Sequence, residues 1–122
     1  MIISQEDMIV LEEAKIANPW YFSILVWSAK VVSQRRGKWS GANPNPFVNF
    51  QRMAEIRQAT VDEAFLWMLA VKESRQSIVD YADDSWMDNI IDRANYLLLW
   101  AGYKIFVKER DMADEQLRSA QD

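Results

Sequence analysis

The chain has 122 residues and a net charge of −4, from 14 Lys and Arg against 18 Asp and Glu, and this length is typical of one domain. Half of the residues are apolar and 12% are aromatic, which excludes the low hydrophobicity of a disordered chain. The sequence contains no Cys and no His, which excludes disulfides, thiolate zinc sites and histidine-dependent triads. Any metal must therefore bind to oxygen ligands, as Mg²⁺, Mn²⁺ and Ca²⁺ do.

The acidic balance argues against duplex nucleic acid as the main ligand, because proteins that bind it do so mainly by neutralising phosphates with basic residues. The N-terminus lacks the positive charge of a signal peptide, and polar residues interrupt the longest apolar run, at 20–32, before it reaches membrane-spanning length. We expect a cytoplasmic protein, in the host cytoplasm if a phage encodes it, that binds neither a membrane nor duplex nucleic acid.

The N-terminal third predicts two helices. Ser4 and Asp7 resemble a capping pair, which predicts a first helix from about Ser4 to Ala17. Asn18 and Pro19 are typical of the N-cap and first position of a second helix. This second helix is apolar nearly all round, so we expect it to be central in the fold or to lie in the interface of a homodimer or higher homo-oligomer.

The middle of the chain contains a break followed by two further helices. Residues 34–46 hold two of the three glycines and two of the three prolines, which predicts one irregular loop. Apolar spacing then predicts a short helix over about 47–57. Thr60 and Glu63 form an S/T-x-x-E capping box, which predicts a helix to about Val79.

A last long helix is expected to begin at a cap formed by Asp84 or Ser85. Its helically spaced apolar stripe predicts the side that packs on the core: Trp86, Ile90, Ala94, Leu97, Ala101 and Ile105. The polar residues 111–122 are expected to form a solvated helical extension or a frayed tail beyond a single domain at 1–110. The predicted fold is an all-α, single-domain bundle of about five helices.

An acidic strip lies on the opposite side of that last helix, formed by Asp84, Asp88, Asp92 and Asn95. Carboxylates one turn apart repel each other, and two of them can bind Mg²⁺ and through it a phosphate. The alternative is a solvated helix face with acids placed by the helix dipole, which accounts for the first two aspartates and less well for Asp92. Both interpretations stay open at this stage.

Two groups of cations are candidates for binding phosphate. Lys72 and Arg75 lie at i and i+3 near the end of their helix, where the dipole alone also favours cations. Arg36, Lys38 and Trp39 combine charge with an indole that is able to stack on a base, although a surface turn explains them as well.

Several segments occur together in an order that resembles a family of small bacteriophage proteins associated with nucleotide modification or nucleotide metabolism. The match covers about residues 35–96 and consists of RGKWSG, Asn49-Phe50, RMAEI, TVDEAFLWMLAVKESR and DNIIDRANY. Trp39 and Ser40 stand where the family has Tyr-Gly. The chain is more distantly similar to MazG-like all-α nucleotide pyrophosphohydrolases, and this similarity implies that Asp88 and Asp92 are one half of a Mg²⁺ site.

The leading hypothesis is a protein that binds a nucleotide or a similar phosphorylated small molecule and that, if it is an enzyme, is a Mg²⁺-dependent pyrophosphohydrolase. Asp88 and Asp92 are the expected catalytic residues, with Asp84 as a further metal ligand. The expected ligand-binding residues are Arg36, Lys38, Trp39, Lys72, Arg75, Asn95 and Tyr96. The alternative is a phage accessory or anti-defence protein that binds a host protein or sequesters a signalling nucleotide without turnover.

Overall fold

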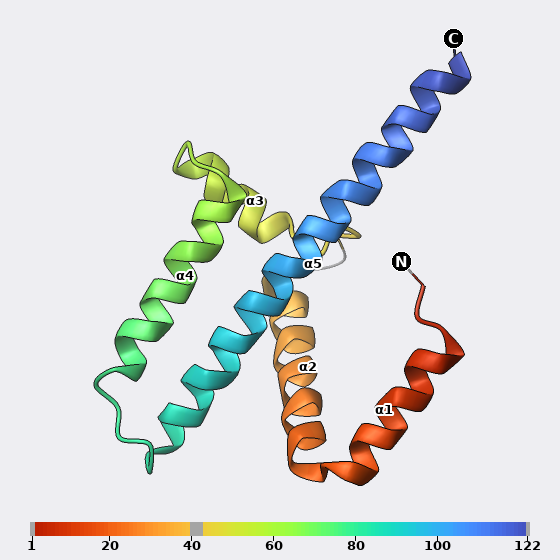
Figure 1. Cartoon of the computed structure of the whole chain (residues 1–122). Coiled ribbons are helices and arrows are strands. Elements are labelled where there is room, and N and C mark those ends of the chain that lie inside the picture. The colour runs from red at the N-terminus through yellow and green to blue at the C-terminus, as the bar shows by residue number, and fades with distance from the viewer. Residues whose placement is uncertain (1, 40–42, 122) are drawn as a thin grey trace.

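The computed structural model describes residues 2–39 and 43–121, and every regular element in these ranges is a helix (Figure 1). The expected all-α bundle is therefore confirmed. No helix in the described part of the chain is long and apolar enough to cross a membrane. In chain order the helices are α1 (Gln5–Ala17), α2 (Pro19–Trp39), α3 (Val48–Ile56), α4 (Val61–Gln76) and α5 (Asp84–Gln121).

The helix starts follow from their capping residues. Ser4 and Asp7 form a reciprocal capping box at the start of α1, as expected. Asn18 Oδ1 accepts a hydrogen bond from the backbone N–H of Tyr21 at the start of α2, and Thr60 Oγ1 accepts one from Glu63 at the start of α4. These side chains satisfy backbone donors that the first turn of a helix leaves without partners.

The start of α5 differs from the expectation. The carboxylate of Asp83, rather than that of Asp84 or the hydroxyl of Ser85, accepts a hydrogen bond from a backbone N–H, that of Ser85, at 2.8 Å. This hydrogen bond lowers the pKa of the Asp83 carboxyl below its ordinary value, because it stabilises the charged form.

One helix continues past the end expected for it, and the C-terminal residues, expected to form a helical extension or a frayed tail, are helical. Residues 34–39 belong to α2 rather than to the loop, because Gln, Arg and Lys are good helix formers and one glycine, Gly37, costs a helix only about 1 kcal/mol. The helix α5 reaches Gln121, and its last turns contain no Gly or Pro to stop it. These turns are exposed and project beyond the other helices (Figure 1).

The apolar core is an aromatic cluster where α3, α4 and α5 meet. Phe65 of α4 is fully buried, and its ring stacks on Phe50 at 4.1 Å and on Trp100 at 6.0 Å between ring centroids. Phe47 contacts the rings of Tyr103 and Phe106 from the other end of the cluster. The small buried residues Ala54 and Ala64 complete the contact between α3 and α4. Stacked and edge-on pairs of this kind add to the free energy gained from apolar burial.

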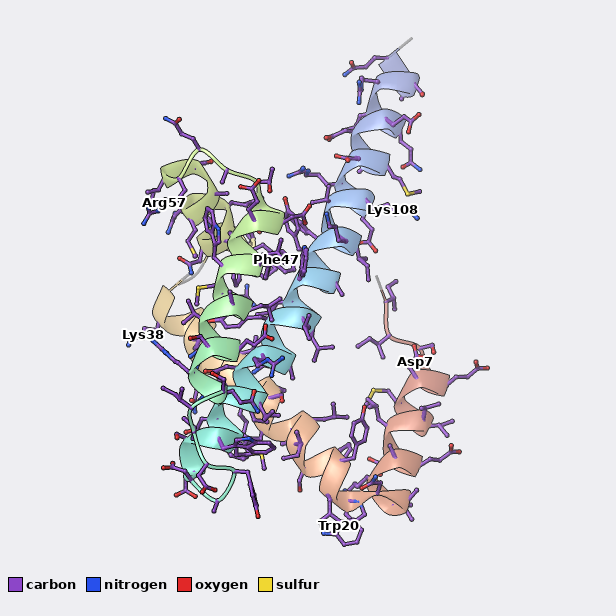
Figure 2. All side chains as sticks on the ribbon, turned by 60° about the vertical axis from the view of Figure 1, so that its left-hand side comes forward. Asp7, Trp20, Lys38, Phe47, Arg57 and Lys108 are labelled. Carbon is purple, nitrogen blue, oxygen red and sulfur yellow. The ribbon has the colours of Figure 1, made fainter. Side chains whose placement is uncertain are left out.

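The first two helices contribute little to this core. The helix α1 packs against α2, and α2 packs against α5, so α1 leans out as a separate arm in both views (Figures 1 and 2). None of the residues of α1 is buried, and Ser28 is the one buried residue among those described in α2. Trp20, labelled in Figure 2, is 79% exposed at the junction of the two helices. A single copy therefore does not bury this helix, and the alternative that it lies in a homo-oligomer interface stays a prediction.

The packing face of α5 is also the reverse of the one expected. Its buried residues are Asn89, Ile91, Asp92 and Asn95, whereas Leu97, Ala101 and Ile105 of the apolar stripe are exposed. The polar residues are inward because neighbouring helices supply their partners, for instance the Ser28 carbonyl oxygen, which accepts a hydrogen bond from Asn95 at 3.2 Å. Buried polar groups are tolerated when such partners are present.

Candidate anion-binding pocket

A buried carboxylate links three helices at the centre of the molecule. Asp92 of α5 is only 6% exposed. Its Oδ1 lies 2.7 Å from Nη2 of Arg35 on α2, and its Oδ2 lies 2.8 Å from Nζ of Lys72 on α4. Each carboxylate oxygen therefore has a cationic partner, which offsets the cost of removing the charge from water.

The two cations differ in their exposure to solvent. The side chain of Lys72 is 12% exposed, whereas that of Arg35 is 44% exposed. The ammonium group is thus held inside the bundle, and the guanidinium group stands at its rim. Because Asp92 contacts both, it fixes their positions relative to each other.

These two cations line an open pocket of about 530 Å³ formed by α2, α3, α4 and α5. Among its described lining residues, Arg35, Lys38 and Lys72 carry positive charge and none carries negative charge. The other lining residues are polar amides, a phenol and apolar side chains: Asn49, Asn95, Tyr96, Val32, Phe50, Met53, Met68 and Leu99. The size, and the combination of an apolar wall with a few converging polar groups, are typical of sites for small molecules.

Tyr96 stands between the charged and the apolar parts of this pocket. Its ring meets that of Phe50 edge-on, with centroids 6.2 Å apart. Burial raises the pKa of the Tyr96 phenol above its ordinary value, and the charge of Asp92 raises it further, while Arg35 and Arg75 act in the opposite direction. The phenol is therefore neutral and able to donate a hydrogen bond at physiological pH.

The structure brings together four of the residues that the sequence nominated for ligand binding, namely Lys38, Lys72, Asn95 and Tyr96. Arg75 is exposed but lies close enough to Tyr96 to influence its ionisation.

The other nominated cation and the indole lie elsewhere. Arg36 donates a hydrogen bond to the carbonyl oxygen of Asn43 at 3.4 Å and lines a separate groove between α2 and α5. The side chain of Trp39 lies outside the described part of the chain.

The nomination from sequence left out Arg35 and the α3 wall of the pocket. Arg35 was visible only as a member of a cationic run, and nothing in its spacing linked it to an aspartate 57 positions later. For Asn49 and Phe50, the only indication of a role in the site was the Asn-Phe pair in the family resemblance.

The acidic strip divides into a buried half and an exposed half. Asp92 and Asn95 are buried, so the solvated-face interpretation is wrong for them, whereas Asp84 and Asp88 are exposed. Within the described ranges, no three carboxylates gather closely enough to hold a metal ion.

The arrangement of Asp92 does not fit a Mg²⁺ ion, because Arg35 and Lys72 already contact both of its oxygens. The metal ion expected from the sequence stays a prediction.

Comparisons of the chain with protein-family models, with curated proteins and with solved structures find no match. The class of protein is therefore described from the structure alone. The chain is an all-α bundle with a cationic pocket between four helices.

Proposed function

We propose that this protein binds a small molecule that carries phosphate groups, a nucleotide in the first place, in the pocket formed by α2, α3, α4 and α5. The observation that carries the proposal is the convergence of Arg35, Lys38 and Lys72 on one cavity. Arg35 and Lys72 share a single carboxylate, that of Asp92, so these three side chains together carry one net positive charge. A phosphate group in the cavity would be attracted to that charge.

The chemistry of the cations suits phosphate rather than an isolated carboxylate. A guanidinium group binds two phosphate oxygens through parallel N–H groups, and an ammonium group adds a compact point charge. Because Asp92 already orders Arg35 and Lys72, a ligand loses less of its binding free energy in arranging these side chains.

The remaining walls of the pocket suit an organic moiety next to the phosphates. Phe50 and Tyr96 offer aromatic surface, and Met53 and Met68 offer adaptable apolar surface. The amide of Asn49 is able both to donate hydrogen bonds to a heterocyclic base and to accept them. A nucleotide combines these apolar, hydrogen-bonding and anionic parts, in agreement with the phage-family resemblance of residues 35–96.

Binding is the part of the proposal that the pocket supports, and turnover is a further prediction from the sequence. The catalytic carboxylates expected for a Mg²⁺-dependent pyrophosphohydrolase are Asp88 and Asp92, but Asp88 is exposed and both oxygens of Asp92 already contact cations, so the pocket supports no hydrolytic step. Sequestration of an intact nucleotide needs only the pocket. The two outcomes differ in whether the ligand is recovered unchanged.

The test is a thermal-shift panel of pyrophosphate, nucleoside mono-, di- and triphosphates and cyclic dinucleotides, each with and without Mg²⁺. A ligand that binds only the folded protein raises the melting temperature as its concentration exceeds the Kd. We expect phosphate-bearing ligands to raise it and the corresponding nucleosides to have little effect. Chromatography of the recovered ligand then separates an enzyme from a binder, and the Mg²⁺ arm tests the metal.

Charge-removing variants locate the binding site. Lys72→Gln and Arg35→Gln should each reduce the ligand-induced shift to a small fraction of the wild-type value. Lys104→Gln is the matched control, since Lys104 also pairs with an aspartate, Asp62 at 2.7 Å, but lies outside the pocket. An equal loss in all three variants would point to non-specific charge attraction. If no phosphate-bearing ligand shifts the wild type, the proposal is wrong and the alternative of a host-protein partner gains weight.

A further inference from the structure

The chain exposes more surface than a folded monomer of its mass. Its accessible surface is 9395 Å², whereas globular monomers of 14.3 kDa expose about 6,800 Å². The projecting end of α5, residues 108–121, accounts for part of the difference of about 2,600 Å². The rest lies on the other helices. An obligate homodimer buries about 1,000–2,500 Å² per chain, so the part of the difference that lies on the other helices leaves room for such an interface.

The arm α1 is a capped helix whose apolar side chains are not buried. Its capping box fixes where it begins, yet none of its residues is buried, and Ile9, Val10 and Ile16 are 56%, 60% and 81% exposed. A helix of 13 residues is marginal in water unless an apolar face is covered. The arm therefore needs a partner that α2 alone does not provide.

A second uncovered apolar surface lies on the outer side of α5. This outer face consists of Leu97, Leu98, Ala101 and Ile105, all exposed. It is continuous with an apolar groove of about 490 Å³ between α2 and α5, which Leu25, Ala29 and Leu98 help to line. Contiguous exposed apolar side chains on a folded protein mark interaction surfaces.

The nature of the two uncovered surfaces favours a second copy of this chain as the partner. Both expose aliphatic side chains, such as Ile9 and Val10 on α1 and Leu97 and Leu98 on α5. A two-fold interface must be self-complementary, because the same patch contributes both sides. A patch that combines these two aliphatic faces meets this condition, and the excess of exposed surface is of the order that such an interface buries.

We infer that a second copy of this chain covers the arm α1 together with the outer face of α5, so that the protein is a homodimer. The inference does not depend on the anion-binding pocket, which α2, α3, α4 and α5 of one chain form by themselves.

Light scattering coupled to size-exclusion chromatography tests the assembly. At micromolar concentration we expect a mass about twice 14.3 kDa. The double variant Ile9→Glu, Leu97→Glu should shift this mass toward that of one chain, whereas Leu117→Glu on the projecting end of α5 should leave it unchanged. A wild-type mass of one chain over the whole concentration range would overturn the inference and favour a different protein as the partner of this surface.

Thiol labelling locates the interface without relying on a variant that dissociates or unfolds. The chain has no Cys, so Ile9→Cys, Leu97→Cys and Leu117→Cys each carry one thiol. In a single copy these three positions are similarly exposed, at 56%, 53% and 63%, and would react with a maleimide at similar rates. In the homodimer the first two should react at least ten times more slowly than the third, and the difference should vanish in denaturant. Equal rates in the native dimer would place the interface elsewhere and refute the surface.

Discussion

The N-terminal helices and the region 47–106 differ in how far their apolar residues are buried. Residues 47–106 bury Phe47, Phe50, Phe65 and Ile91 within one chain, whereas α1 and α2 leave most of their apolar side chains exposed. The more apolar segment, 20–32, is thus the less buried one. Hydrophobicity alone predicts that a face must be covered, and the packing of opposing helices decides whether the same chain covers it.

The largest expected effect tests the core side of this comparison. Phe65→Ala removes a fully buried ring that stacks on Phe50 and Trp100, and it should lower the free energy of unfolding by about 3–5 kcal/mol. Ile16→Ala, at an 81% exposed position of α1, should change it by less than about 0.5 kcal/mol when the chains are dissociated. Urea denaturation at low protein concentration measures both, and similar losses would show that the arm is part of the core.

The next effect separates the buried aspartate from the exposed one a turn earlier. Asp92→Asn leaves Lys72 without its carboxylate partner inside the bundle. The expected loss is about 2–3 kcal/mol, somewhat below the usual cost of breaking a buried pair, because Arg35 is half-exposed. Asp88→Asn should stay within about 0.5 kcal/mol. Equal effects in urea denaturation would contradict the division of the acidic strip.

A smaller effect concerns the contact that ties α2 to α5. Asn95→Ala removes the hydrogen bond to the carbonyl oxygen of Ser28 and should cost about 1 kcal/mol. Because this contact lies at the boundary between the core and the N-terminal helices, hydrogen exchange should accelerate in α2 more than in α4. Uniform acceleration would indicate that the N-terminal helices and the core unfold as one unit.

The smallest effect depends on pH. Hydrogen bonds from Lys104 and Trp100 lower the pKa of Asp62 below its ordinary value. A lowered pKa in the folded state means that this stabilisation is present above the ordinary value near 4 and is lost as the pH falls through the folded-state pKa. Asp62→Asn should therefore reduce the loss of stability between pH 7 and pH 3, by a few tenths of a kcal/mol, because the side chain is partly exposed. Urea midpoints at the two pH values measure the difference, and an unchanged difference would contradict it.

The local features of the fold were predictable from the sequence, and its pairing of helices was not. Capping residues such as Ser4, Asn18 and Thr60 act on adjacent backbone groups, so their positions fixed the helix starts in advance. The inward face of α5 was predicted on the wrong side, because Asp92 and Asn95 are buried only through partners on α2 and α4. Within the site, Lys72 and Asp92 were each nominated from the spacing of charged residues along their own helices. The contribution of Arg35 could not be predicted in this way, because it depends on how α2 docks on α5.

The most direct test of the pocket is a titration of the ¹⁵N-labelled protein with pyrophosphate and with a nucleoside triphosphate, followed by amide chemical shifts. The account predicts that shifts concentrate in the C-terminal half of α2 and around Lys72, Asn95 and Tyr96, with the triphosphate extending them to Asn49 and Phe50 on α3. Shifts centred on Lys104 and on the exposed end of α5, or no saturable shifts with either ligand, would contradict it.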